Sequence, residues 1–343
     1  MTRPKVFVLQ PIMDIALDAL KDFADVEVFE SDRMITKLEL LDGVRRCDFL
    51  FALGASTIDD EILDANPDLK GIATMGLWAD PVFVKAATKR KIPVTIIPHL
   101  ITKTTADLTV ALVIGVAWRI VEADRFTRCG RFRQNQSTTF LTTELGGKKV
   151  GIIGLGEIGK EVAKRLRTFE MEISYTKRSR LSVEEEEDLG VTWVAERDDL
   201  LRESDFVVIM TTYNESTHKF IGKREFELMK PTAFFINSAR GRIVDEPALI
   251  EALTTKQIAG AGLDVYWDEP PVAEPSRVNP ELFKFDNVLL MPHIGSATVE
   301  ARNAMCLAVV DNLRALVEDR IPPGIVNPEL YGREALLVTD RKG

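Results

Sequence analysis

An apolar segment in the middle of the chain runs directly into a glycine-rich turn. Residues 150–153 read Val-Gly-Ile-Ile, and residues 154–159 read Gly-Leu-Gly-Glu-Ile-Gly, which is a G-x-G-x-x-G pattern. In such a pattern the first glycine permits a tight turn, the second lets a pyrophosphate approach the backbone, and the third lets helix and strand pack closely. The helical stretch that follows would direct free N–H groups and the positive end of its dipole at the phosphates. We therefore predict a dinucleotide site at Gly154, Leu155, Gly156, Glu157, Ile158 and Gly159.

Short apolar strands alternate with helices on both sides of this turn, which indicates parallel α/β structure. Strands are expected at residues 6–9, 26–29, 49–53, 71–75, 94–97, 149–153, 173–176, 191–194, 206–210, 233–237, 261–265 and 288–291. Long helical segments are expected at residues 104–128 and 300–318. At 343 residues the chain is too long for one ordinary core, so two doubly wound α/β domains are predicted.

Three residues in separate segments after the turn suit one reaction. They are Arg240 in Asn-Ser-Ala-Arg-Gly, Glu269 in Asp-Glu-Pro, and His293 in Met-Pro-His-Ile-Gly-Ser. Reduction of a 2-oxo acid needs a cation that binds the carboxylate and polarises the carbonyl, and Arg240 offers a rigid, permanently charged fork. It also needs an acid that protonates the new alkoxide, and an imidazole titrates near neutral pH.

Glu269 would orient this imidazole and stabilise its charged form. Taken singly, each residue has another interpretation. Arg240 could pair with Asp245, Glu269 could be a solvated loop charge, and His293 could be a packing residue. Because they follow a nucleotide motif in this order, we predict that Arg240, Glu269 and His293 are catalytic.

The strand expected at residues 171–175 bears on cofactor choice. An NAD-binding chain places Asp or Glu at its end, about 20 residues past the glycines, to bond the ribose 2′-hydroxyl. Here the residues at and after this position are Thr176, Lys177, Arg178, Ser179 and Arg180. The site thus lacks a carboxylate that would repel a 2′-phosphate and has donors that could hold one. We predict NADP(H), against the alternative of an exposed basic turn.

With these motifs, residues 5–329 resemble the D-isomer-specific 2-hydroxyacid dehydrogenase family. They are most similar to its NADPH-dependent glyoxylate and hydroxypyruvate reductases, including at residues 175–178, Tyr-Thr-Lys-Arg. The resemblance implies the same catalytic arginine, glutamate and histidine. It also implies that Asp264 contacts the nicotinamide carboxamide and that Thr104 lies near the cofactor.

The family binds the substrate carboxylate against a glycine-rich loop, which corresponds here to residues 75–80 with Gly76 and Leu77. Trp78 replaces the second glycine of the usual Gly-x-Gly. This large aromatic side chain either reshapes the substrate pocket or packs in an interface between domains. Glu157 is a second departure, because many relatives carry arginine there, and the change should weaken pyrophosphate binding slightly.

The resemblance also implies that the helix at 300–318 crosses back to the first domain. We therefore expect a flavodoxin-like substrate domain of residues 1–103 and 297–330. A Rossmann-type cofactor domain of residues 104–296 is inserted into it, and residues 331–343 form a tail. Family members usually pair through the region 104–146, so a homodimer is expected.

The net charge of −9 argues against nucleic acid or an anionic membrane as the main partner, since both require clustered cations. Three separated cysteines, Cys47, Cys129 and Cys306, lack metal-ligand spacing and indicate reduced thiols, so no metal is predicted. The N-terminus lacks the apolar run of a signal peptide. No stretch reaches the roughly 18 apolar residues of a membrane span. A cytoplasmic enzyme is expected.

The acidic run at residues 184–188 is expected to be a solvated helix face rather than a metal site, because adjacent carboxylates on a helix diverge. His99 and His218 have no partner pattern in the sequence. Three functions fit the chain. The first is NADPH-dependent reduction of small 2-oxo acids such as glyoxylate and hydroxypyruvate, and the second is the same chemistry on a 2-keto sugar acid or bulkier 2-oxo acid. The third is a nucleotide-sensing binding protein of the C-terminal-binding protein type.

Overall fold

The computed structural model describes residues 3–31, 33–53, 58–97, 100–133, 138–269 and 277–332. The chain divides into two compact units. The first holds the described residues up to Leu100 and from Ala297 onward, and the second holds those from Ile101 to Glu269 and from Arg277 to Ser296. His99, Pro270 and the expected tail from residue 333 lie outside the described residues.

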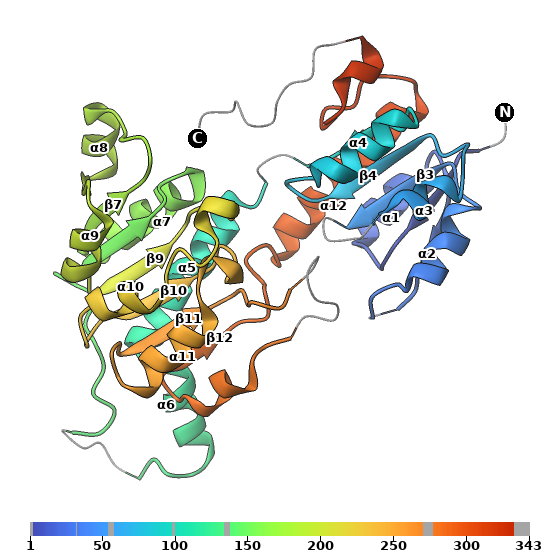
Figure 1. The fold of residues 1–343 in the computed structure, drawn as a ribbon. Coiled ribbons are helices and arrows are strands. Elements are labelled where there is room, and N and C mark those ends of the chain that lie inside the picture. The colour runs from blue at the N-terminus through green and yellow to red at the C-terminus, as the bar shows by residue number, and fades with distance from the viewer. Residues whose placement is uncertain are drawn as a thin grey trace. The chain divides into compact units, whose positions relative to one another are not determined.

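The first unit is built on a parallel sheet of five strands (Figure 1). The strands are β1 (Lys5–Val8), β2 (Asp25–Val28), β3 (Phe49–Leu53), β4 (Gly71–Met75) and β5 (Val94–Thr95). Their spatial order is β2-β1-β3-β4-β5, which is the flavodoxin-like order. Every named pairing in the sheet is parallel, so the predicted flavodoxin-like fold is confirmed.

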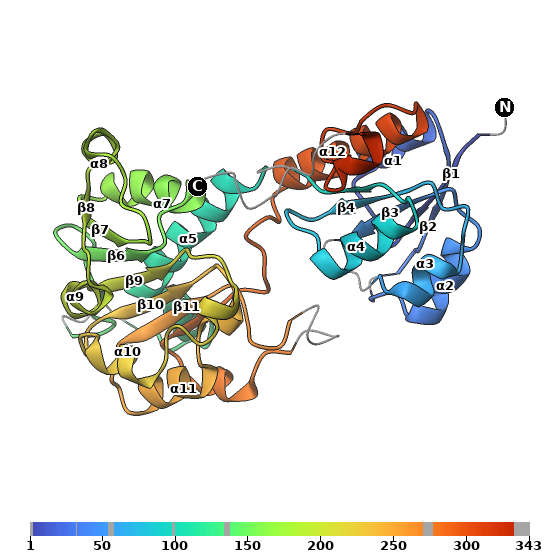
Figure 2. The same cartoon turned by 45° about the horizontal axis from the view of Figure 1, so that its top comes forward.

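Helices cover both faces of this sheet (Figure 2). They are α1 (Asp14–Lys21), α2 (Lys37–Val44), α3 (Asp60–Asp64), α4 (Pro81–Lys89) and α12 (Val299–Val317). Helices α1 and α12 lie side by side on one face, and α2, α3 and α4 follow one another on the other. Strand β3 reads Phe-Leu-Phe-Ala-Leu because it is covered on both faces, as strands of parallel sheets usually are.

The second unit contains a parallel sheet of seven strands. They are β6 (Lys149–Ile153), β7 (Glu172–Thr176), β8 (Val191–Trp193), β9 (Phe206–Ile209), β10 (Phe234–Asn237), β11 (Gly260–Leu263) and β12 (Val288–Leu290). Their order is β12-β11-β10-β9-β6-β7-β8. Numbered within this unit, the strands follow the Rossmann order 3-2-1-4-5-6 with one more strand at the edge. The predicted Rossmann-type fold is therefore confirmed.

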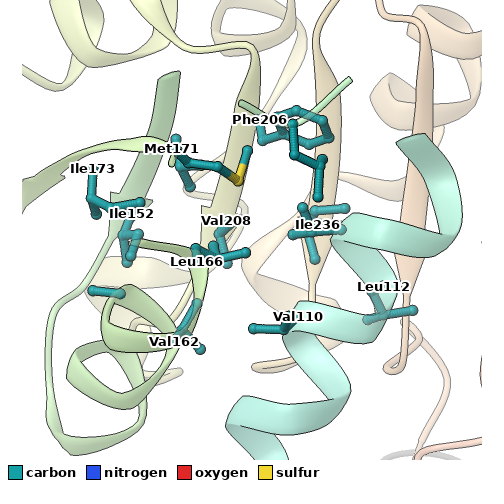
Figure 3. Close-up of a cluster of buried hydrophobic side chains, with 14 of the residues drawn as sticks. Val110, Leu112, Ile152, Val162, Leu166, Met171, Ile173, Phe206, Val208 and Ile236 are labelled. Atoms are coloured by element: carbon teal, nitrogen blue, oxygen red, sulfur yellow. The ribbon is translucent and has the colours of Figure 1, made fainter. Parts of the chain in front are cut away.

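Two apolar clusters fill the two faces of the second sheet, because successive strand residues point to opposite sides. Figure 3 shows one of them, where Val110, Val162 and Leu166 from the covering helices pack against residues of the sheet such as Val208. This face is covered by α5 (Thr102–Ala117), α7 (Glu157–Arg167) and α8 (Val183–Leu189). The other face is covered by α9 (Arg197–Glu203), α10 (Lys223–Leu228) and α11 (Glu246–Thr254).

The helix predicted at residues 104–128 is wrong as a single element. The structure has α5 and then α6 (Ile120–Arg128), and the two axes are bent by 59°. Arg119 lies between them in the left-handed region with φ 50°. Its guanidinium pairs with Glu122 at 2.7 Å and lies 5.0 Å over the ring of Phe140. These contacts stabilise a break that no glycine or proline marks in the sequence.

Among the described residues, no single helix is long and apolar enough to cross a membrane. Helices α5 and α6 reach that length and composition only as a bent pair.

Candidate active site

The glycine turn has room for a phosphate where the motif requires it. Gly154 has φ 93°, and a Cβ on it would lie 2.7 Å from the backbone of Thr211. A Cβ on Gly159 would lie 2.8 Å from the carbonyl oxygen of Gly154. At Gly156, the N-cap of α7, a Cβ would meet no described atom within 4 Å. Gly154 and Gly159 are therefore packed tightly against neighbouring backbone, whereas the space beside Gly156 is open. This arrangement fits the binding of a pyrophosphate.

The carboxyl end of β7 is hydrogen-bonded to the glycine turn. The Gly154 amide donates to the carbonyl of Thr176 at 2.9 Å. Lys177 donates from Nζ to the Leu155 carbonyl at 3.3 Å. Burial, and then the nearby Lys160 cation, lower the pKa of the Lys177 ammonium. Thr176 and Lys177 thus lie beside the glycines, as the cofactor prediction requires.

The other residues predicted to bind the cofactor differ in their side-chain contacts. Arg178 and Ser179 are exposed, and neither has a side-chain hydrogen bond or ion pair within the described ranges. Arg180 is bound to Glu186 through both carboxylate oxygens, at 2.8 Å from Nε and 2.7 Å from Nη2. Glu157 begins α7, and its carboxylate lies 3.6 Å from the ammonium of Lys160.

Glu186 corrects the prediction for the acidic run. It is only 8% exposed, while its acidic neighbours in α8 remain exposed. Its carboxylate also accepts a 2.6 Å hydrogen bond from the hydroxyl of Tyr175. Because α8 packs this one face against β7, the carboxylate is buried with two partners rather than solvated.

Arg240 follows β10, and the side chain of Asn237 shapes its loop. Asn237 donates to the Arg240 carbonyl at 3.0 Å and accepts from the Ala239 amide at 3.0 Å. The exposed guanidinium donates to the Ala239 carbonyl at 2.6 Å and forms no ion pair in the described part of the chain. Asp245, the partner in the alternative interpretation, lies 3.1 Å from Lys219 instead. Arg240 is therefore available to an anionic ligand.

Glu269 and His293 come together from the ends of β11 and β12. Nδ1 of His293 lies 3.1 Å from a carboxylate oxygen of Glu269. The Glu269 side chain is 11% exposed and the His293 side chain 48%. The other carboxylate oxygen of Glu269 accepts from the Tyr266 amide at 3.2 Å. A fixed, largely enclosed acid thus orients one nitrogen of an imidazole that remains open to solvent.

The backbone around His293 is unusual and firmly held. His293 has φ 55°, a left-handed conformation that residues other than glycine rarely adopt. The next two amides, of Ile294 and Gly295, donate to the two oxygens of Asp264 at 2.8 and 2.9 Å. Burial raises the pKa of the Asp264 carboxyl, although these amides oppose the change.

Two supports of this loop escaped the sequence analysis. The Thr105 hydroxyl donates to the Gly295 carbonyl at 3.0 Å, and the Tyr266 hydroxyl donates to the Met291 carbonyl at 2.7 Å. Neither residue belongs to a recognisable motif. Thr104, which was predicted to lie near the cofactor, is the half-buried neighbour of Thr105 in α5.

The predicted substrate loop belongs to the first unit. It begins after β4, where the carbonyl of Gly76 accepts from the Ile97 amide at 3.0 Å, and Leu77 is half-buried. Trp78 is 58% exposed, so it does not pack in the core of its own unit. Within the described ranges, no group of three or more His, Cys, Asp or Glu side chains could hold a metal ion.

The strand order of the second unit and its open glycine turn define a dinucleotide-binding domain. Residues 110–295 match the family model of the NAD binding domain of D-isomer specific 2-hydroxyacid dehydrogenases. The chain is 42% identical over 332 residues to a glyoxylate reductase of Thermococcus litoralis, covering 96% of this chain and 98% of that one. The chain belongs to the D-isomer specific 2-hydroxyacid dehydrogenase family.

Solved structures agree with this assignment. A putative D-isomer specific 2-hydroxyacid dehydrogenase from Polaromonas superposes with a TM-score of 0.88 at 31% identity, covering 95% of this chain and all of that one. An NADPH-dependent glyoxylate/hydroxypyruvate reductase of Sinorhizobium meliloti, solved in complex with NADP and malonate, has a TM-score of 0.77 at 30% identity. That similarity covers 95% of this chain and 97% of that one.

Proposed function

We propose that this protein is an NADPH-dependent reductase that converts small 2-oxo acids, such as glyoxylate and hydroxypyruvate, to 2-hydroxy acids. The observation that carries the proposal is the 3.1 Å pair of His293 and Glu269, which follows the carboxyl ends of the same parallel sheet as Arg240, a residue with no ion pair in the described part of the chain. The glyoxylate reductase of Thermococcus litoralis supports the substrate class. In this proposal residues 104–296 bind the cofactor, and residues 1–103 with 297–330 carry the substrate loop.

Each of the three residues has a separate role. Arg240 binds the substrate carboxylate and polarises the adjacent carbonyl. His293 donates a proton to the oxygen of that carbonyl, and Glu269 stabilises the imidazolium beforehand. Asp264 contacts the nicotinamide carboxamide, Thr104 lies near the cofactor, and bound NADPH supplies the hydride.

The preference for NADPH is supported by the residues beside the glycine turn. Lys177 is a partly buried cation with another cation, Lys160, nearby, so a bound phosphate would relieve an unfavourable interaction. Arg178 is exposed without a side-chain partner among the described residues. Thr176 places no carboxylate against a 2′-phosphate.

Steady-state kinetics with glyoxylate and hydroxypyruvate test this function. We expect kcat/KM with NADPH to exceed that with NADH by more than about tenfold, because each charge-assisted contact contributes about 1.5–3 kcal/mol. The double change Thr176→Asp with Arg178→Ala should reverse the preference. Equal use of both cofactors by the wild-type enzyme would contradict the NADPH assignment, and absence of turnover would contradict the reductase itself.

The exposure of Trp78 favours a second candidate with the same chemistry. An aromatic side chain that is 58% exposed on the predicted substrate loop offers an apolar surface to a ligand. A bulkier 2-oxo acid or a 2-keto sugar acid would use that surface better than glyoxylate. Comparing kcat/KM across oxo acids of increasing size distinguishes the two candidates.

A homodimer is also proposed. Trp118, Ile120 and Leu141 are each at least half exposed in the region expected to pair two copies. Light scattering on the purified protein should give about twice the 38.4 kDa mass of the chain.

A further inference from the structure

Arg180 is held differently from the other basic residues of the 177–180 turn. Both oxygens of Glu186 accept from its guanidinium, and the Glu186 side chain is 9% exposed. The hydroxyl of Tyr175, which is fully buried, donates to Glu186 and accepts from the Leu181 amide at 2.9 Å. Strand β7, the turn and helix α8 are thus joined through one carboxylate.

This arrangement leaves much of the guanidinium free. Arginine has five N–H donors, and the contact with Glu186 uses two of them. The Arg180 side chain is 54% exposed, so its remaining donors can reach a ligand. A side chain already fixed in one geometry loses less entropy when it binds an anion than a mobile one does.

We propose that Glu186 is a positioning residue of the cofactor site, which orients Arg180 toward the phosphate on the adenosine ribose. The inference rests on the proposed use of NADPH. It adds a residue from α8 that the sequence placed on a solvated face. Glu186 acts through Arg180 and does not itself touch the cofactor.

Binding of two cofactor fragments tests the inference without turnover. Adenosine 2′,5′-bisphosphate carries the 2′-phosphate, and adenosine 5′-monophosphate lacks it. Calorimetry would give both dissociation constants for the wild type, Glu186→Gln and the control Glu187→Gln. Glu187 is the exposed neighbour of Glu186 on α8 and has no side-chain partner among the described residues.

We expect Glu186→Gln to weaken the bisphosphate by about three- to tenfold, a usual coupling between residues of one network. Its affinity for the monophosphate should stay unchanged, which also shows that the site remains folded, and Glu187→Gln should match the wild type for both. Arg180→Met should also weaken the bisphosphate and not the monophosphate. Adding Glu186→Gln to Arg180→Met should change neither dissociation constant further.

Three results would overturn the inference. Tighter binding of the bisphosphate by Glu186→Gln would mean that Glu186 competes with the phosphate for Arg180. Equal weakening of both fragments would mean that Glu186 only maintains the fold. An unchanged bisphosphate constant would mean that Arg180 is placed without Glu186. A wild type that did not prefer the bisphosphate over the monophosphate would instead contradict the proposed use of NADPH, so that failure can be told apart from the three results above.

Discussion

The carboxylate of Asp264 holds the backbone of Gly295, two residues beyond His293, through a 2.9 Å hydrogen bond from the Gly295 amide. A Cβ on Gly295 would lie 3.2 Å from the same carboxylate oxygen, so a larger residue would crowd this contact. The bond helps to keep His293 at φ 55°, a conformation that costs roughly 1–3 kcal/mol for a residue other than glycine. The position of the proposed proton donor therefore depends on a residue 29 positions earlier in the chain.

Replacing Asp264 should show this dependence. Asp264→Ala would leave the amides of Ile294 and Gly295 without their acceptor, and an unsatisfied buried group costs about 1–3 kcal/mol. We expect a loss of unfolding free energy of that size in urea titrations, and a fall in kcat of about tenfold or more. Unchanged stability and turnover would show that the loop keeps its conformation without this carboxylate.

The pair of His293 and Glu269 should determine the pH dependence of turnover. Reduction consumes the proton that His293 donates, so its rate should fall as pH rises, whereas oxidation of the 2-hydroxy acid should rise over the same range. Glu269→Gln should move both profiles to lower pH, because the charged imidazole loses its partner. His293→Ala should reduce turnover by about 10²- to 10⁴-fold with NADPH binding nearly unchanged. If that variant kept normal turnover, the proton would have to come from another group.

Arg240→Lys tests recognition of the carboxylate, which all substrates share. Lysine keeps the positive charge but loses the fork that matches two oxygens. We expect KM to rise and kcat to fall to the same extent for glyoxylate, hydroxypyruvate and a bulkier oxo acid. An effect that varied strongly with side-chain size would place Arg240 against the side chain rather than the carboxylate.

Trp78→Gly tests recognition of the substrate's side chain. This change restores the usual loop of the family, so kcat/KM for glyoxylate should change little while the order of larger substrates changes. A difference of one methylene in an apolar pocket is worth about 1–3 kcal/mol, or roughly 10- to 200-fold. If wild type and Trp78→Gly ranked the substrates in the same order of kcat/KM, Trp78 would be a packing residue and not a substrate contact.

Glu186 should contribute to stability above acidic pH and lose its contribution in acid. Hydrogen bonds from Arg180 and then Tyr175 lower its pKa from the ordinary 4.5 to about 2. A carboxyl whose pKa is lowered by folding stabilises the folded state above its unfolded pKa, and the effect is lost as pH falls toward the folded value. The difference in unfolding free energy between wild type and Glu186→Gln should therefore shrink as pH is lowered from 6 to 3. A constant difference would contradict the lowered pKa.

The features that could be predicted from sequence are local or repeat along the chain. A strand such as β9, Phe-Val-Val-Ile, is apolar on both sides because helices cover both faces of its sheet, so a short window of residues is enough to predict it. The turn from Gly154 to Gly159 is likewise specified by the steric needs of three glycines close together in sequence. The strand ends also placed Arg240, Glu269 and His293 at one edge, since parallel strands end on the same side.

Other features depend on contacts between residues that no local sequence pattern relates, and only the tertiary structure shows them. The break between α5 and α6 depends on Arg119 meeting Phe140, and the solvated-face prediction failed at Glu186 because Tyr175 and Arg180 reach it from β7 and the following turn. The left-handed backbone at His293 depends on Asp264, which directly follows β11, and on Thr105 of α5. Hydrogen bonds of this kind form between groups that folding brings within about 3 Å, and a sequence read along the chain contains the groups but not their separation.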